Sequence, residues 1–126
     1  MSLNIPVSIG ELWDKYTILK IKELKINDAT KLEHVKREIE YLFEHMKEYQ
    51  FQNDNNFNDL FKINQELWVI EDNIREKERM QEFDDEFIEL ARSVYFTNDK
   101  RALIKKEINE EYNSLICEVK NYKKYA

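Results

Sequence analysis

Apolar residues recur every three or four positions along most of the chain, which is the pattern of amphipathic α-helices. The most regular stripe alternates spacings of three and four residues and comprises Leu32, Val35, Ile39, Leu42, Met46 and Tyr49. A second stripe, nearer the C-terminus, comprises Ile104, Ile108, Leu115, Val119 and Tyr122. Such alternation is typical of the seam between packed helices, so we predict an all-α protein.

Residues that favour helix N-termini divide this pattern into five predicted helices. Ser8 and Glu11 form a capping box at the first helix, and Asp84 can cap the fourth. The other breaks fall at 27–28, in the Asn- and Asp-rich loop 52–59, and at 97–99. We expect the helices to end at about residues 26, 49, 80, 95 and 122, which makes the second, third and fifth the long ones.

Chain length and short connections set the architecture. A chain of 126 residues suffices for one domain with a real core, and short loops make neighbouring helices antiparallel. The sequence therefore predicts a single domain over residues 1–126, an antiparallel helical bundle of about five helices. Because the stripes of the second and fifth helices are long, we expect them to pack between subunits as well, in a homodimer.

The chain has a single glycine and a single proline, which removes several structural classes. Sheets joined by tight turns depend on glycine or proline at those turns. Glycine-rich loops that hold phosphates, as in P-loop and dinucleotide-binding proteins, are excluded as well. With 42% hydrophobic residues, the chain is too apolar to be disordered.

The charge and the cysteine content of the chain indicate its compartment and the classes of partner that it can bind. The formal net charge is −6, and the mildly basic stretch 99–126 alternates cations with carboxylates, so nucleic-acid binding is disfavoured. No apolar stretch reaches membrane-spanning length, and the N-terminus lacks the features of a secretory signal. The single cysteine, Cys117, suits a reducing compartment. We therefore expect a cytoplasmic protein without membrane insertion.

The sequence predicts neither a metal site nor a cofactor. His34 and His45 are too far apart along one helix to share a metal. Neither histidine has a glutamate three residues before it, as di-iron helical bundles require. Carboxylate pairs with the spacing used by magnesium-dependent pyrophosphatases, such as Glu86 and Glu89, arise easily by chance among 26 acidic residues.

One charged residue of the third predicted helix is expected to lie within an apolar arc. At about 100° per residue, Asn64 and Glu71 fall between two apolar rows, formed by Leu60, Leu67 and Ile74 and by Phe57, Phe61 and Trp68. A buried charge is costly unless it is paired, so Glu71 should meet a cation from the set Lys20, Arg75, Arg92 and Arg101. Either the pair is a structural network that sets helix register, or Glu71 acts as a base or ligand group in a polar pocket lined by Trp13, Tyr16 and Trp68.

The tripeptide Glu-Leu-Trp occurs twice, at 11–13 and 66–68, and contains the chain's only tryptophans. Tryptophans at helical spacing are more often core residues than ligand platforms. We therefore expect Trp13 and Trp68 in the core, on two helices that face each other.

Three segments resemble a family of small, all-helical bacterial proteins of unknown function. They are IPVSIGELWDKYTILKIK (5–22), LWVIEDNIR (67–75) and FDDEFIELARSVYFTNDKRALIKKEIN (83–109), and they span much of the chain. The resemblance implies an association with genes for cell-surface polysaccharides and glycosyltransferases, and it supplies no catalytic residues. The polar positions of its pattern are Asp14, Lys15, Lys22, Glu71, Asp72, Arg75, Arg92, Asn98, Asp99, Arg101, Lys105 and Asn109.

Two hypotheses for the function follow. In the first, the chain is a non-enzymatic interaction or accessory protein of the cytoplasm, linked to cell-surface polysaccharide biosynthesis. In the second, it binds or transforms an anionic phosphosugar or nucleotide sugar, and the candidate binding residues are Lys15, Lys22, Trp68, Glu71, Asp72, Arg75, Arg92 and Arg101. Convergence of the cations on one cleft without carboxylate partners favours the second hypothesis, whereas scattering or one-to-one pairing favours the first.

Overall fold

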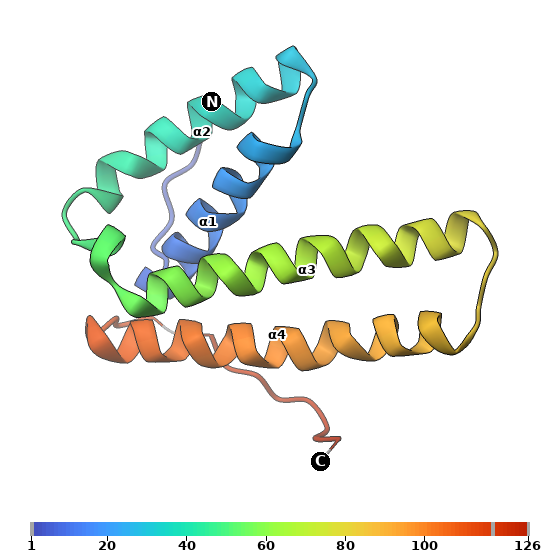
Figure 1. Ribbon diagram of the computed structural model, residues 1–126. Helices are drawn as coiled ribbons and strands as arrows, with labels where there is room; N and C mark the ends of the chain where they lie inside the picture. Colours follow the sequence, from blue (N-terminus) through green and yellow to red (C-terminus); the bar gives the residue numbers. More distant parts are fainter. Residues whose placement is uncertain (1, 117, 126) are drawn as a thin grey trace.

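The computed structural model describes residues 2–116 and 118–125, and over these residues the protein is built of helices without strands. Helices α1 (Ile9–Lys25) and α2 (Ala29–Met46) form one hairpin, which a short 3₁₀ helix, η1 (Phe51–Asn53), connects to the second hairpin. The second hairpin is longer and consists of α3 (Asn55–Arg79) and α4 (Asp85–Glu111), which run antiparallel (Figure 1). The all-α class is confirmed, with four α-helices in the described residues where five were predicted.

The helices begin where the sequence provides N-caps. The Ser8 hydroxyl accepts a hydrogen bond from the backbone N–H of Glu11 at 3.0 Å, as the capping box predicts. Asp28 and Asp84 cap α2 and α4 in the same way. Asp54 accepts hydrogen bonds from the backbone N–H groups of residues 56 and 57, so α3 begins inside the segment 52–59 that was predicted to be a loop.

The fourth and fifth predicted helices are one continuous helix, α4, so the predicted break at 97–99 is wrong. Thr and Asn favour caps because their side chains compete for backbone hydrogen bonds. In this protein Thr97 is buried, and the Asn98 side chain accepts a hydrogen bond from Arg101 at 3.5 Å. Packing and a side-chain partner thus keep these residues inside the helix.

The predicted extension of the last helix to Tyr122 is also wrong, because α4 ends at Glu111. Asn113 has a left-handed backbone with φ of 51°, and the N–H of Ser114 donates to the backbone oxygen of Asn109 at 2.8 Å. This is a Schellman motif, in which asparagine is a common substitute for glycine. Leu115 and Val119, expected in an apolar stripe, are exposed.

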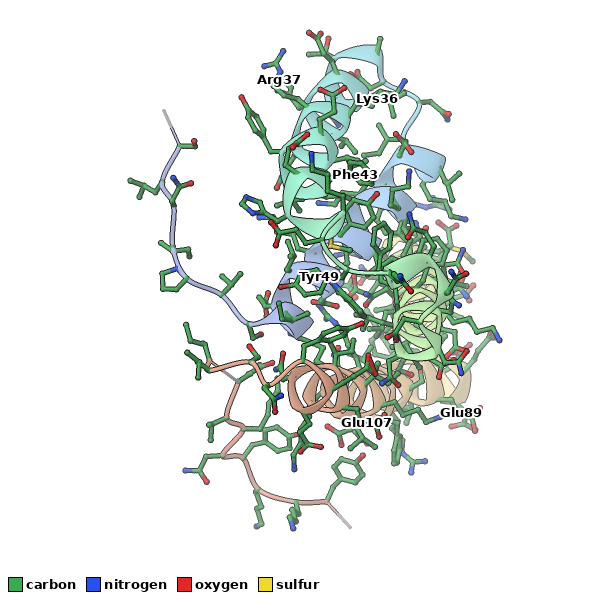
Figure 2. All side chains as sticks on the ribbon, turned by 90° about the vertical axis from the view of Figure 1, so that its left-hand side faces the viewer. Lys36, Arg37, Phe43, Tyr49, Glu89 and Glu107 are labelled. Carbon is green, nitrogen blue, oxygen red and sulfur yellow. The ribbon has the colours of Figure 1, made fainter. Side chains whose placement is uncertain are left out.

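The core lies where α1 meets the other three α-helices. Trp13 is fully buried, and its ring packs edge-on against Tyr49, Phe57 and Tyr112 at centroid distances of 6.3, 5.6 and 5.1 Å. Figure 2 shows Tyr49 near this junction, whereas Lys36 and Arg37 lie on the outer part of α2. Trp68 is only partly buried, so the prediction that both tryptophans lie in the core is confirmed for Trp13 alone.

The far half of the α3–α4 hairpin projects beyond α1 and α2 (Figure 1). We call residues 68–96 the distal arm. Every residue of this arm is described, and none of them is buried. Lys77 stabilises the turn between α3 and α4, because its Nζ lies within 3.0–3.1 Å of carboxylate oxygens of Glu82, Asp84 and Glu86. Among the described residues, no helix is long and apolar enough to cross a membrane.

Candidate functional site

The first turn of α1 lies directly against α4. The backbone N–H of Gly10 donates a hydrogen bond to Oδ1 of Asn109 at 2.7 Å. A Cβ atom at Gly10 would lie 2.7 Å from the backbone oxygen of Lys105 and 2.9 Å from Asn109 Oδ1. Because glycine has no Cβ, it permits this close approach of the two helices.

Asp14 lies one turn further along α1 and is only 2% exposed. Arg101 of α4 binds its carboxylate with two nitrogens, since Nε lies 2.9 Å from Oδ1 and Nη2 donates to Oδ2. Asn64 of α3 donates to Asp14 Oδ1 at 3.0 Å and to the Thr17 hydroxyl at 2.8 Å. Asp14 therefore joins three helices, and its bidentate contact with arginine is the strong form of an ion pair.

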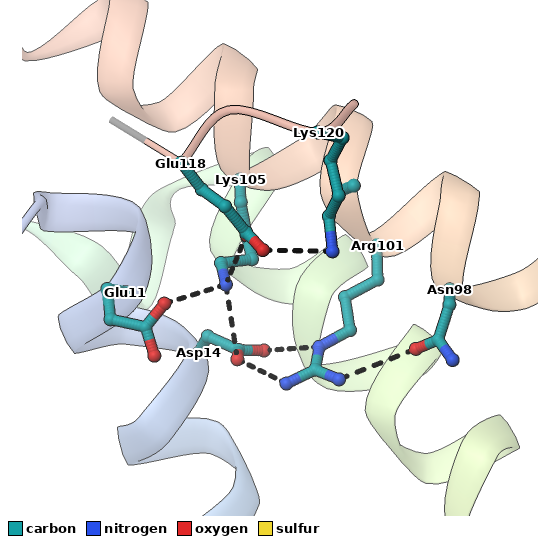
Figure 3. A pocket seen from close by; sticks show the side chains of 8 residues that line it. Glu11, Asp14, Asn98, Arg101, Lys105, Glu118 and Lys120 are labelled. Carbon is teal, nitrogen blue, oxygen red and sulfur yellow. Dashed lines mark hydrogen bonds and ion pairs between the residues drawn. The ribbon is translucent and has the colours of Figure 1, made fainter. Parts of the chain in front are cut away.

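Lys105 extends this network toward the C-terminal segment (Figure 3). Its Nζ lies 2.8 Å from Glu11, 3.3 Å from Glu118 and 3.6 Å from Asp14. Burial by itself lowers a lysine pKa, but the hydrogen bond to Glu11 and the three negative charges outweigh burial and raise the pKa of Lys105. The ammonium group is therefore charged at neutral pH.

Two pockets adjoin the Asp14–Arg101 pair. One, of about 210 Å³, is lined by Glu11, Asp14, Asn98, Arg101, Ala102, Lys105, Glu118 and Lys120 (Figure 3). The other, of about 230 Å³, is lined by Glu11, Asp14, Lys15, Ile18, Leu19, Lys22, Glu38 and Arg101. Asp14 and Arg101 therefore line both of these polar pockets.

The charges at the first pocket balance one another. Arg101 and Lys105 contact Asp14 and Glu11, and Lys120 lies 2.9 Å from Glu118. The hydrogen bond to Asp14 raises the pKa of Arg101, and the hydrogen bond to Lys120 lowers the pKa of Glu118. Three cations and three carboxylates are thus paired with one another at this pocket.

Three of the eight candidate binding residues predicted from the sequence lie together, and five do not. Lys15, Lys22 and Arg101 line the second pocket, where Lys15 pairs with Glu38 at 3.2 Å and Arg101 with Asp14. The remaining candidates lie on the distal arm: Trp68, Glu71, Asp72, Arg75 and Arg92. Arg92 is exposed and stands over the Phe96 ring at 5.8 Å. The candidate cations therefore form two groups, three at the second pocket and two on the distal arm, and four of the five have a carboxylate or an aromatic partner on their own chain.

Glu71 is not in the core, which corrects the prediction of a buried charge within the apolar arc. Its side chain is 51% exposed and pairs with Arg75, four residues on, at 3.6 Å. The angular position was inferred correctly, because Asn64, two helical turns earlier, faces α1 and is buried. Glu71 is exposed because α1 covers the hairpin only as far as its near half.

Asp14 and Lys105 were not among the predicted binding residues, although both belong to the polar positions of the motif pattern. The sequence spacing did contain an indication that Asp14 is buried. Asp14, Thr17 and Ile21 follow one another at helical intervals, and all three are buried. Lys105 stands three residues before Ile108, which is fully buried, but a lysine so placed is usually exposed.

Comparisons with protein-family models, with curated proteins and with solved structures found no match to this chain. Among the described residues, no group of three or more His, Cys, Asp or Glu side chains is arranged to hold a metal ion. The assignment of function therefore depends on the geometry of the α1–α4 contact and of the distal arm.

Proposed function

We propose that this protein is a non-enzymatic interaction or accessory protein. The observation that supports the proposal is the pairing of the central cations with carboxylates of the same chain: Arg101 with Asp14, and Lys105 with Glu11 and Glu118. An anionic substrate entering this pocket would have to displace one of those carboxylates. The displaced charge would then lose its partner, which is costly where the pair is buried.

The proposal includes a setting and a quaternary structure. A cytoplasmic location is in keeping with the single cysteine. A role beside cell-surface polysaccharide biosynthesis in a bacterium follows the resemblance of the motif segments. A homodimer is part of the same proposal, because an accessory protein of this kind acts through its surfaces.

A ligand test separates this function from substrate binding. The purified protein is melted in the presence of millimolar UDP-glucose and of glucose 1-phosphate. A ligand that binds only the native state raises the melting temperature in a saturable way. We expect no change in melting temperature and no consumption of either compound. A saturable rise, or turnover, would overturn the non-enzymatic proposal.

A genetic test addresses the pathway. Deletion of the gene in its source bacterium should reduce the amount of cell-surface polysaccharide, and the wild-type gene should restore it. The variant Lys120→Ala, which changes the first pocket, should restore the polysaccharide as well if that pocket is not a working site. An unchanged amount of polysaccharide in the deletion strain would contradict the proposed role.

A second candidate function, small-molecule binding, is favoured by the groove between α4 and the C-terminal segment. The pocket of about 210 Å³ adjoins one of about 550 Å³, and the two share Asn98 and Lys120. The larger pocket is lined by Tyr95, Tyr122 and Tyr125 together with polar side chains. Aromatic walls with a few polar groups are typical of ligand sites, and the lysines would suit an anionic phosphosugar or nucleotide sugar.

Calorimetric titration with UDP-glucose tests this candidate. Binding to the wild-type protein that Lys120→Ala abolishes would support it. Leu24→Ala is the matched control, because Leu24 is exposed on α1 and lines neither pocket. Absence of heat with the wild-type protein, or equal binding by Lys120→Ala, would rule out this groove as the UDP-glucose site.

A further inference from the structure

The protein exposes more surface than a compact monomer of its size. Its accessible surface is 9447 Å². A compact monomer of 15.5 kDa exposes roughly 7,200 Å². The excess of about 2,200 Å² lies within the range of about 1,000–2,500 Å² that each copy buries in a permanent homodimer. The terminal segments contribute to the excess, and so do two helical parts that contain no buried residue, residues 29–38 of α2 and the longer distal arm.

The distal arm carries large apolar side chains that a single copy leaves uncovered. Val69, Met80, Phe83, Ile88 and Tyr95 are between 42% and 53% exposed, and they are spread over several faces of the arm. Two packed helices cannot bury both of their apolar faces, so domains add a second layer. In the near half of the hairpin that second layer is α1, and the distal arm lacks an equivalent.

The groove that α1 occupies continues along the arm. In the near half, α1 contacts Asn64 of α3 and Arg101 of α4. Trp68 follows Asn64 by one turn, and Phe87 precedes Arg101 by four turns, so both lie on the α1 side of their helices. Ala91 lies two turns before Asn98, a residue of the pocket beside Asp14, and it is exposed. The α1 side of the arm therefore presents the apolar residues Trp68, Phe87 and Ala91 beside two charged ones, Glu71 and Arg75.

The α1 side of the arm carries charges of both signs, so the same surface on a second copy could complement it. Glu71 and Arg75 follow Asn64 by two and three turns and form an ion pair at 3.6 Å. A two-fold axis that passes between Glu71 and Arg75 would place Glu71 of one copy opposite Arg75 of the other. An interface made by the same patch on both copies requires this kind of self-complementarity.

We propose that the distal arm of a second copy fills this groove, so that two α3–α4 arms form a four-helix bundle around a two-fold axis. The inference deepens the proposed function by naming its first partner, a second copy of this chain. It differs from the dimer predicted from the sequence, which used the stripes of the second and fifth predicted helices. Pairs of helical hairpins pack in this way with apolar side chains inside.

Sedimentation velocity on the wild-type chain and two variants tests the inference. Ala91→Glu places a charge in the groove at an exposed position that favours helix, so the fold of a single copy tolerates it. Ala29→Glu is the matched control, because Ala29 is exposed at the start of α2, away from the arm. We expect the wild type and Ala29→Glu to sediment as dimers. For Ala91→Glu we expect the dissociation constant to rise about 30-fold or more, with unchanged helical circular dichroism.

A wild-type monomer would overturn the inference, and so would an Ala91→Glu dimer as tight as that of the wild type. If Ala91→Glu fails to fold, Arg75→Glu, which reverses a charge at an exposed position on the α1 side of the arm, replaces it. The outcome of the ligand test of the proposed function does not depend on the outcome of sedimentation. A monomer that does not bind UDP-glucose overturns the second-copy inference and the homodimer, and leaves the non-enzymatic function standing. A dimer that binds UDP-glucose overturns the non-enzymatic function and leaves the second-copy inference standing.

Discussion

Asp14 and Arg101 are separated by 87 positions in the sequence, and two hydrogen bonds between them join the start of α1 to the middle of α4. The Asp14 side chain is 3% exposed and that of Arg101 28%. Removing Arg101 would leave the buried Asp14 carboxylate with only the more distant Lys105, at 3.6 Å, as a charged partner among the described residues. The ion pair therefore has a larger effect on stability than exposed pairs such as Glu71–Arg75.

We expect Arg101→Leu to lower the free energy of unfolding by about 3–5 kcal/mol, because it leaves the Asp14 carboxylate buried and without its arginine. Urea denaturation followed by circular dichroism measures this loss. The matched control is Arg37→Leu, which removes an exposed arginine of α2 whose one ion-pair partner in the described part of the chain is Glu33. The control should change stability by less than about 1 kcal/mol.

The double variant Asp14→Leu/Arg101→Leu should lose less stability than the two single variants added together, because it removes both buried charges at once. Urea midpoints of the four proteins give the interaction energy. Strictly additive losses would mean that the two side chains act independently, contrary to the geometry.

We expect Gly10→Ala to destabilise the protein by about 1–3 kcal/mol, because the new methyl group would overlap the Lys105 backbone oxygen and the Asn109 amide. The sign is informative, since glycine within a helix is normally less stable than alanine by about 0.5–1 kcal/mol. Thermal unfolding measures the difference. A higher melting temperature for Gly10→Ala would show that α1 and α4 are not in this close contact.

Tyr125 should ionise later than an ordinary tyrosine. Its hydroxyl donates to Asp99 at 2.5 Å, and this hydrogen bond raises the pKa of Tyr125 from 10.0 to about 12. Because the folded-state pKa is the higher one, the contribution to stability is complete below pH 10.0 and is lost as the pH rises through about 12. An NMR titration of the Tyr125 ring should report the shifted midpoint.

Asp99→Asn is the control for this titration, because it removes the charge that opposes ionisation of Tyr125. The midpoint should then fall toward 10.0, the value of an unperturbed tyrosine. At acid pH the sign is reversed. Hydrogen bonds from Tyr125 and Tyr122 lower the pKa of Asp99, so their contribution is present at neutral pH and is lost as the pH falls through that lowered pKa.

Hydrogen exchange should distinguish the two halves of the long hairpin. In the dimer, we expect amides on both sides of the arm to be protected, because the second copy supplies the missing layer. In Ala91→Glu, amides of 68–79 and 85–96 should exchange at least about 10-fold faster, while those of 57–67 remain protected by α1. Equal amide exchange rates of the arm in both proteins would mean that no second copy packs against the arm.

Local sequence determined the helical class and most helix ends, because caps and apolar spacing act over a few residues. Ser8, Asp28 and Asp84 were all assigned correctly as N-caps. Thr97 and Asn98 resembled a cap equally well, yet they lie inside α4. The difference is tertiary, since burial of Thr97 and the contact of Asn98 with Arg101 offset the local preference.

Helical periodicity determined on which side of its helix each residue lies, but it did not determine how far along that helix a neighbour extends. Asn64 and Glu71 share one side of α3, and the spacing treated them alike. Only the tertiary structure decided that α1 covers Asn64 and leaves Glu71 exposed. The angle of a side chain depends on its own helix, whereas its burial depends on contacts such as Asp14–Arg101, which bring together residues that are distant in sequence.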